Sequence, residues 1–282
     1  MLSYEHDFHA GNHGDILKHL CLEKILETLV KKEKPFTIIE SHAGSGIYNL
    51  NDDRSLKTKE ALNGIQKIYK FNENPAIPFT QNLSRYIEIE KPYLEKNLYA
   101  GSVEIEKMYL RKGDALHVAE KHPKAIEQLK INYEKAPAKI HIYEEDGFST
   151  LIKLTPPLVK RGLILCDPSY ESENDYKEVA KTLSCVHKKW NTAIIALWYP
   201  LLTTKKYALS QMINALENSV KLNKVQSEYI NLQLKIADED SFSKEEGKAH
   251  MYGSGMFIIN PPYQMEEELT KTIQLTEKLL TI

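Results

Sequence analysis

Residues 162–170 read Gly-Leu-Ile-Leu-Cys-Asp-Pro-Ser-Tyr, a short apolar run that passes directly into an aspartate and a proline. A run without polar alternation is typical of a strand that is buried on both faces of a sheet. Similar runs cover residues 36–40, 115–120, 140–145 and 192–200, with helix-like stretches between most of them. Because parallel strands need a helix-length connection, this alternation predicts a doubly wound α/β fold with a mostly parallel sheet.

The C-terminal part of the chain departs from the simple alternation. After a predicted helix near residues 203–218, strand candidates at 225–234 and 255–260 are joined by a charged stretch. Two strands that follow one another in this way predict an antiparallel hairpin at one position of the sheet. The sequence therefore predicts a central sheet of seven strands.

The first two predicted strands are separated by a long segment. Residues 51–97 predict two or three helices, broken by Asn74-Pro75 and Ile77-Pro78. We expect a helical insertion at about 51–97 within a single domain that covers residues 1–282. An N-terminal arm and a first helix are expected within residues 1–31.

The composition limits the class of protein. With 282 residues, 42% of them apolar, the chain can bury a sizeable core, and no apolar run is long enough to cross a bilayer. The N-terminus is polar and histidine-rich, and three cysteines without CxxC spacing fit reduced thiols, so we expect a cytoplasmic protein. A net charge of −2 means that any contact with nucleic acid needs a local basic patch.

The ends of the first three predicted strands suggest a nucleoside site. The strand that ends at Glu40 runs into residues 41–46, a glycine-containing turn that lacks both the GxGxxG pattern and a Walker lysine. Glu120 ends the second strand and could accept hydrogen bonds from both ribose hydroxyls. After the third, Asp146 could accept from an adenine amino group, and the N–H of Gly147 could serve a ring nitrogen. Each acid alone could be a solvated loop carboxylate, but the series matches the crevice beyond parallel strand ends.

The fourth strand delivers Asp167-Pro168-Ser169-Tyr170 to the same edge. The N6 amine of adenine is a poor nucleophile, because its lone pair is delocalised into the ring, so hydrogen-bond acceptors that favour a pyramidal amine assist its attack. The Asp167 carboxylate and the Pro168 carbonyl can be these acceptors, and Tyr170 can stack on an extruded base. This chemistry needs no metal. The alternative is an ordinary turn after a buried strand.

Two further segments compete for a functional interpretation. Asn260-Pro261-Pro262-Tyr263 has the same chemical logic as the tetrapeptide at Asp167, but it follows the last predicted strand. Residues 4–15 hold His6, His9 and His13 among aromatic side chains. Together with His19 they could form a zinc site, although the spacing matches no standard cluster, or the segment could be a structural arm. They could also form a lid in which Tyr4 and His6 contact RNA and Lys18 meets phosphate.

Several segments spread over nearly the whole chain resemble one family, the RlmJ family of bacterial large-subunit ribosomal RNA adenine-N6 methyltransferases. The resemblance is carried by residues 1–4 and 8–13, Lys18-His19, His42-Ala43-Gly44, Gly101-Ser102, Glu120 with His122-Pro123, Asp146-Gly147-Phe148, residues 161–164 and residues 196–200. One departure is Ser169, which stands where the family has a second proline.

The resemblance implies a Rossmann-like class I S-adenosylmethionine-dependent methyltransferase fold with a helical insertion. It implies that Asp167 is catalytic and that Tyr4, His6 and Lys18 help to bind the substrate. It also implies that S-adenosylmethionine contacts His19, His42, Ser102, Glu120, Asp146, Gly147 and Asp167.

The implied reaction is methylation of the N6 amine of adenine 2030 in 23S ribosomal RNA. We expect protein-free RNA or an early assembly intermediate as the substrate, and a monomeric enzyme without a metal. Alternatives are a DNA adenine-N6 or a protein glutamine methyltransferase, because both present a planar amine, or an RNA-binding module that has lost its chemistry.

Overall fold

A seven-stranded sheet forms the centre of the protein. The computed structural model describes residues 5–73, 77–136, 140–222, 227–242 and 249–282. The strand order is β5-β4-β1-β6-β7-β9-β8, and only β9 runs against the others. The predicted mostly parallel sheet of seven strands is therefore confirmed. Its strands are β1 (Thr37–Glu40), β4 (Ala115–Ala119), β5 (Ile140–Tyr143), β6 (Gly162–Cys166), β7 (Ile194–Leu202), β8 (Tyr229–Lys235) and β9 (Met251–Ile259).

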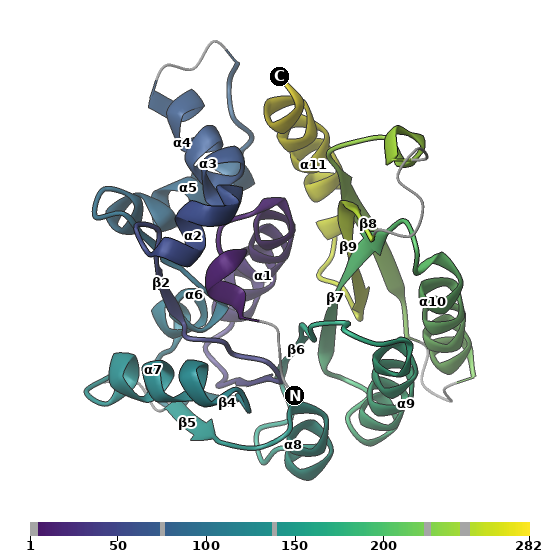
Figure 1. Ribbon diagram of the computed structural model, residues 1–282. Helices are drawn as coiled ribbons and strands as arrows, with labels where there is room; N and C mark the ends of the chain where they lie inside the picture. Colours follow the sequence, from purple (N-terminus) through teal and green to yellow (C-terminus); the bar gives the residue numbers. More distant parts are fainter. Residues whose placement is uncertain (1–4, 74–76, 137–139, 223–226, 243–248) are drawn as a thin grey trace.

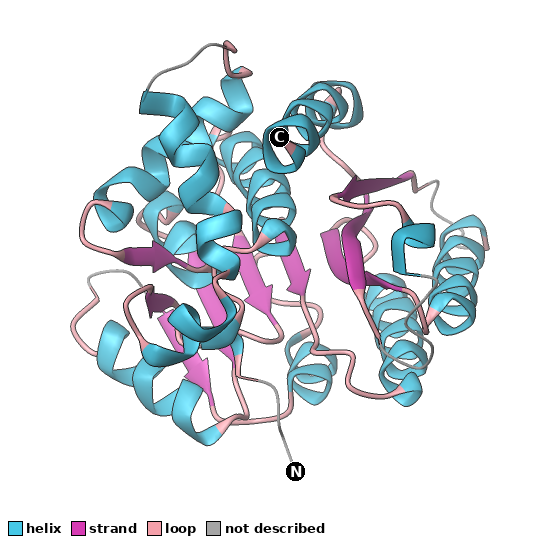
Figure 2. Cartoon of the chain, turned by 45° about the horizontal axis from the view of Figure 1, so that its top comes forward, coloured by secondary structure: helices cyan, strands magenta, loops and turns pink. Residues whose placement is uncertain are grey.

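Helices cover both faces of this sheet (Figure 2). Side chains alternate between two cores: in β1, Ile38 belongs to one and Ile39 to the other, and in β6 Leu165 and Cys166 divide in the same way. The first core also contains α1 (His13–Val30), α6 (Ser102–Tyr109), α7 (Pro123–Tyr133) and α11 (Met265–Thr281). The second contains α8 (Gly147–Leu154), α9 (Glu173–Lys189) and α10 (Lys206–Lys221). Two covered faces explain why the predicted strands are apolar without alternation.

The described residues of the predicted insertion form four helical segments rather than two or three. They are α2 (Asp53–Thr58), α3 (Glu60–Asn63), α4 (Ile65–Glu73) and α5 (Gln81–Leu94). A short antiparallel pair that the sequence analysis did not predict, β2 (Ile47–Asn49) with β3 (Leu98–Ala100), joins the two ends of the insertion. The predicted break at Asn74-Pro75 lies outside the described residues.

Helix α1 lies between the insertion helices and the β8–β9–α11 region (Figure 1). Most of its residues are buried, because it packs against β9 on one side and against α5 and α6 on others. The Asn12 side chain accepts hydrogen bonds from the N–H groups of Gly14 and Asp15, which caps the start of the helix. No helix in the described part of the chain is both long enough and apolar enough to cross a bilayer.

The N-terminal arm, which includes the 3₁₀ turn η1 (His6–Phe8), is fastened to the insertion. The Glu60 carboxylate bonds to His9 (2.9 Å) and accepts from the Asn12 side-chain amide (2.9 Å). Arg54 forms ion pairs with Glu5 and Asp7 at 2.9 and 3.1 Å. These contacts join the arm to the insertion, although the two segments are about fifty residues apart in the sequence.

We predict that Leu20→Ala destabilises the protein by about 2–5 kcal/mol, because Leu20 is fully buried in α1 and its truncation leaves a cavity. Leu56→Ala is the matched control, since Leu56 is 53% exposed and its truncation should change stability by no more than about 0.5 kcal/mol. Urea unfolding followed by circular dichroism measures both. Equal losses in the two variants would contradict the central position of α1.

Candidate functional site

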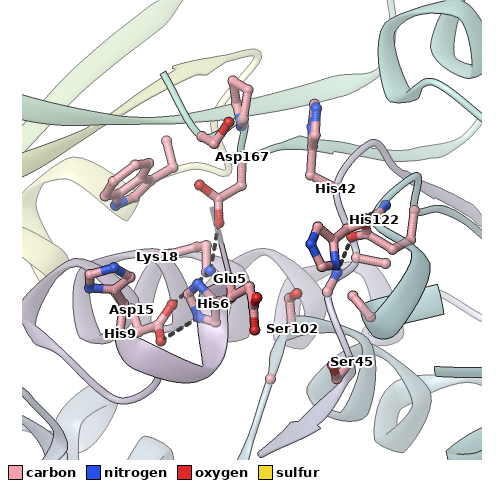
Figure 3. Close-up of a pocket in the computed structure, with 18 of the residues that line it drawn as sticks. Glu5, His6, His9, Asp15, Lys18, His42, Ser45, Ser102, His122 and Asp167 are labelled. Carbon is pink, nitrogen blue, oxygen red and sulfur yellow. Dashed lines mark hydrogen bonds and ion pairs between the residues drawn. The ribbon is translucent and has the colours of Figure 1, made fainter. Parts of the chain in front are cut away.

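A cavity of about 430 Å³ lies at the carboxyl edge of the parallel strands. This is the edge at which ligands bind in open α/β sheets. Its lining combines the turn after β1, the segments that follow β4, β5 and β6, the arm, α1 and the start of α6 (Figure 3). The structure brings ten of the predicted site residues to this one cavity: His6, Lys18, His19, His42, Ser102, Glu120, Asp146, Gly147, Asp167 and Pro168.

Glu120 holds the glycine turn that follows β1. Its carboxylate accepts hydrogen bonds from the N–H of Gly44 (2.8 Å), Lys121 (2.8 Å) and His122 (2.7 Å). Gly44 has a φ of +59°, and a Cβ atom there would lie 2.1 Å from the Tyr48 hydroxyl, so only glycine fits. A carboxylate has about four acceptor positions, which leaves Glu120 about one further bond for a ligand.

The start of α8 packs tightly against the same turn. A Cβ atom at Gly147 would lie 2.0 Å from the Ser41 carbonyl oxygen, so this contact requires glycine. Asp146 caps α8 by accepting from the Ser149 N–H at 3.0 Å. The His42 ring contacts Phe148 edge-on and its Nδ1 lies 2.7 Å from Ser41 Oγ. Burial lowers the pKa of His42, so its imidazole is neutral near pH 7.

Lys18 connects α1 to the segment that follows β6. Its Nζ lies 2.6 Å from Asp167 Oδ2 and 2.8 Å from Asp15 Oδ1 (Figure 3). Asp15 Oδ2 in turn lies 3.0 Å from His6 Nε2. Burial opposes the charge on Lys18, but the two carboxylates hold its pKa well above the usual value. A buried lysine between two aspartates is not placed for the predicted contact with RNA phosphate, which corrects that interpretation.

A buried pair of carboxyl groups lies behind the cavity wall. Glu40, at the end of β1, accepts a hydrogen bond from Ser102 Oγ, and its side chain meets that of Glu106. Burial raises the pKa of Glu40 to about 7. Burial and the proximity of Glu40 raise the pKa of Glu106 well above its usual value. Both carboxyl groups are therefore protonated more readily than exposed ones.

Tyr170 does not reach the cavity. Its φ of +52° turns the side chain back into the core, where the ring packs 4.6 Å from that of Tyr176. The Tyr170 hydroxyl donates to the Trp198 carbonyl oxygen at 2.9 Å. The predicted stacking of Tyr170 on a base does not fit this position. Trp198, Pro200, Leu202 and Met251 form an apolar wall of the cavity instead.

The competing tetrapeptide lies at the opposite edge of the sheet. Because β9 is antiparallel, Ile259 pairs with Ile195 near the start of β7, whereas Asp167 follows the far end of β6. The Asn260 amide donates to the carbonyl oxygens of Asn191 (2.9 Å) and Ala193 (2.8 Å). Asn260 therefore has a structural partner on each side of the turn before β7. Tyr4, a predicted substrate contact, lies outside the described residues.

Sequence reasoning missed Asp15 and Trp198 in the cavity lining and Glu40 behind it. Glu40 carried a signal, since an ionisable residue ends a strand whose centre is apolar. Asp15, three residues before the predicted Lys18 on the same helix, carried a weaker one. The wall at Trp198 carried none beyond its position at the carboxyl end of a strand that neighbours β6.

We predict that Glu106→Gln becomes more stable than the unsubstituted protein as the pH rises from about 6 to about 8.5. A carboxyl group whose pKa is raised on folding stabilises the folded state at low pH, and this contribution is lost as the pH passes through the folded-state pKa. Glutamine does not titrate, so the difference in Tm should grow by at least about 2 °C, the shift expected for roughly 1 kcal/mol. Thermal unfolding of both proteins at each pH measures this difference in Tm. Glu88→Gln is the control, because Glu88 is exposed. A difference in Tm that is independent of pH would rule out a raised pKa at Glu106.

Comparisons with known proteins identify the family of this chain. The family model described as "Ribosomal RNA large subunit methyltransferase D, RlmJ" matches residues 33–281. The protein "Ribosomal RNA large subunit methyltransferase J" of Escherichia coli K12 is 35% identical over 276 residues, which cover 97% of this chain and 92% of the relative. Its Haemophilus influenzae namesake is 33% identical over 284 residues, with 99% and 94% covered.

A solved structure is also similar over nearly its full length. The crystal structure of protein LPL1258 from Legionella pneumophila has a TM-score of 0.82 and 30% identity, and the match covers 97% of this chain and 94% of that one. A family match over most of the chain, two relatives of at least 33% identity and a common fold give one answer. The chain belongs to the RlmJ family of ribosomal RNA large subunit methyltransferases.

Proposed function

We propose that this protein transfers the methyl group of S-adenosylmethionine to the N6 amine of an adenine in 23S ribosomal RNA, and that the target is adenine 2030. The observation that carries the proposal is the position of Asp167-Pro168, which line the same cavity as Glu120 and Asp146. The substrate is RNA that is protein-free or in an early assembly intermediate, because a folded ribosome would bury most sites. We expect the enzyme to act in the cytoplasm as a monomer.

The residues of the cavity suit the proposed cofactor, which supplies an electrophilic methyl group on a sulfonium ion. The carboxylates of Glu120 and Asp146 are acceptors for hydroxyl and amino groups of a nucleoside. The glycine turn at Gly44 lets the backbone approach a ligand closely. His19 Nε2 is buried in the cavity wall and has no hydrogen-bond partner among the described residues, so it can bind a ligand.

Asp167 acts as an acceptor for the amine. Lys18 occupies Oδ2 at 2.6 Å, which leaves Oδ1 for an N6 hydrogen of adenine. Together with the Pro168 carbonyl, this oxygen favours a pyramidal amine whose lone pair is available for attack. Ser169, which stands where the family has a second proline, lines the cavity beside Pro168. Serine at this position does not remove the Pro168 carbonyl.

Trp198 is the surface on which an extruded base would stack. It lies on β7 next to the end of β6, its Nε1 donates to the Gly14 carbonyl oxygen at 3.2 Å, and its ring lies 6.3 Å from that of Tyr170. The hydrogen bond fixes the indole, and Tyr170 supports it from the core. Aromatic stacking is worth about 1–3 kcal/mol per base.

We predict that Asp167→Asn lowers kcat by about a hundredfold or more, because one carboxylate acceptor of the amine is lost. The assay uses purified protein, labelled S-adenosylmethionine and, in parallel, protein-free ribosomal RNA, DNA or a release factor, followed by nucleoside or peptide analysis. Label is expected as N6-methyladenosine in the RNA arm. Label only in DNA or on glutamine would replace the proposed substrate. No label in any arm, with tight cofactor binding, would favour the non-enzymatic alternative.

Asn260→Ala is the matched control for the tetrapeptide, since Asn260 lies at the opposite edge of the sheet. Each folded Asn260→Ala molecule should keep the methyl-transfer rate of the unsubstituted protein. If this variant is inactive while Asp167→Asn is active, the catalytic corner has been assigned to the wrong strand end.

We predict that Trp198→Ala raises KM for RNA by about five- to 150-fold, the loss expected for one stacked base, while affinity for S-adenosylhomocysteine is unchanged. Trp198→Phe should retain most of the affinity for RNA because it keeps an aromatic face. Tyr170→Phe should reduce stability by about 1 kcal/mol and leave KM unchanged, since only a core hydrogen bond is lost. A raised KM in Tyr170→Phe alone would restore the stacking role to Tyr170.

A further inference from the structure

The cavity itself is poorly suited to hold the phosphates of an RNA. Its described lining contains eight carboxylate side chains and three lysines. Lys18 is buried between Asp15 and Asp167. Lys124 forms an ion pair with Glu5 at 2.9 Å. An RNA whose base enters this cavity therefore needs positive charge elsewhere on the protein, because phosphate contacts supply much of the affinity for nucleic acid.

Three loops meet at the opposite, amino edge of the sheet. Residues 31–36 precede β1, residues 110–114 precede β4 and residues 158–161 precede β6. The first residues of these three strands pair with one another, so the loops lie side by side. The loops carry seven cationic side chains, which we call the basic edge: Lys31, Lys32, Lys34, Arg111, Lys112, Lys160 and Arg161. Their acidic side chains are Glu33 and Asp114.

Two arginines of the basic edge fix the loops to one another. Arg111 donates to the Lys32 carbonyl oxygen at 2.9 Å, and Arg161 donates to that of Lys34 at 2.6 Å. Both guanidinium groups lie over the ring of Phe36, at 5.3 and 5.9 Å from its centroid. Burial and the charge of the nearby Arg111 lower the pKa of Arg161. An anion beside the two arginines would relieve this crowding of like charges.

Most cations of the basic edge have no acidic partner. Lys31 pairs with Glu27 at 3.4 Å. Arg111 pairs with Asp114 at 3.0 Å. Four exposed lysines form no ion pair with any described residue: Lys32, Lys34, Lys112 and Lys160. Seven cations against two acids give the loops a net charge of +5, whereas the whole chain carries −2. This surface is therefore a local basic patch of the kind that contact with nucleic acid needs.

We propose that the basic edge binds phosphates of the substrate RNA that lie beyond the target adenine. This inference rests on the proposed methylation of ribosomal RNA. The strand β1 has four residues, and at roughly 3.3 Å per residue it separates the two edges of the sheet by about 13 Å. An RNA that continues past the cavity can therefore reach both edges. Contacts of lysine and arginine with phosphate fix the register of an RNA without reading its bases.

Salt-dependent RNA binding tests the proposal. The triple variant Lys32→Gln, Lys112→Gln, Lys160→Gln removes one lysine from each loop and leaves every backbone carbonyl in place. Filter binding of protein-free 23S ribosomal RNA over a range of KCl concentrations gives Kd and its dependence on salt. Each lost phosphate contact lowers the slope of log K against log salt by about 0.7–0.9. The slope should therefore fall by about two to three, and Kd should rise roughly tenfold.

The matched control removes three exposed lysines from other surfaces: Lys181→Gln, Lys235→Gln and Lys278→Gln. The control changes the net charge of the protein by the same amount, so it isolates the position of the charges. Its Kd for RNA should stay within about twofold of the original. Both triple variants should keep their Tm and their affinity for S-adenosylhomocysteine, because exposed lysines contribute little to stability.

A single substitution provides a second variant with less change to the surface. Lys112→Glu reverses one charge of the basic edge, and it should raise Kd for RNA by roughly threefold or more. This variant gives an answer even if the triple variant does not fold.

Several outcomes would overturn the inference. Unchanged RNA binding in the variants of the basic edge, or equal weakening in the control, would mean that these lysines do not contact RNA. If phosphatidylglycerol vesicles bind the unsubstituted protein but not the variants, while RNA affinity is unchanged, the partner of the basic edge is an anionic membrane. Failure of the unsubstituted protein to methylate RNA is a different result, because it would refute the proposed function itself.

Discussion

The ion pair between Lys18 and Asp167 is the constraint on which the rest of the structure depends. A buried ammonium group is tolerated only when carboxylates compensate the loss of water, and the partners of Lys18 come from α1 itself and from the end of β6. The central helix is thereby fixed against the carboxyl edge of the sheet. The arm is tied to the same place because His6 bonds to Asp15. Sheet, helix and arm meet at one charge cluster.

Most strands of the sheet could be predicted because burial on both faces determines the residue types of each strand by itself. Strands covered on both faces must be apolar throughout, and runs such as residues 162–166 show this directly. The pair β2–β3 could not be predicted, since three residues per strand are too few for a pattern. The divisions between the insertion helices also escaped prediction. Lys59 adopts a left-handed conformation between α2 and α3, which nothing in its residue type requires.

The strand-end part of the site was predictable for a geometric reason. Parallel strands end at one edge, so Glu120, Asp146 and Asp167 gather there whatever their neighbours. Contacts between distant segments were not predictable: Lys18 and Asp167 are 149 residues apart, and the partner of His19 comes from the margin of the insertion. The direction of Tyr170 depends on one backbone angle that the string Asp-Pro-Ser-Tyr does not reveal.

The attachment of the arm to the insertion limits how such a chain can diverge. The side-chain oxygen Oδ1 of Asn12 caps α1, and its side-chain nitrogen Nδ2 donates to Glu60, so one side chain serves two segments. The backbone of Gly11 also accepts from Ile65 at the start of α4. The insertion is therefore not an exchangeable module. A substitution on either side of this junction removes hydrogen bonds from the other, which couples residues 9–12 to helices that follow some fifty positions later.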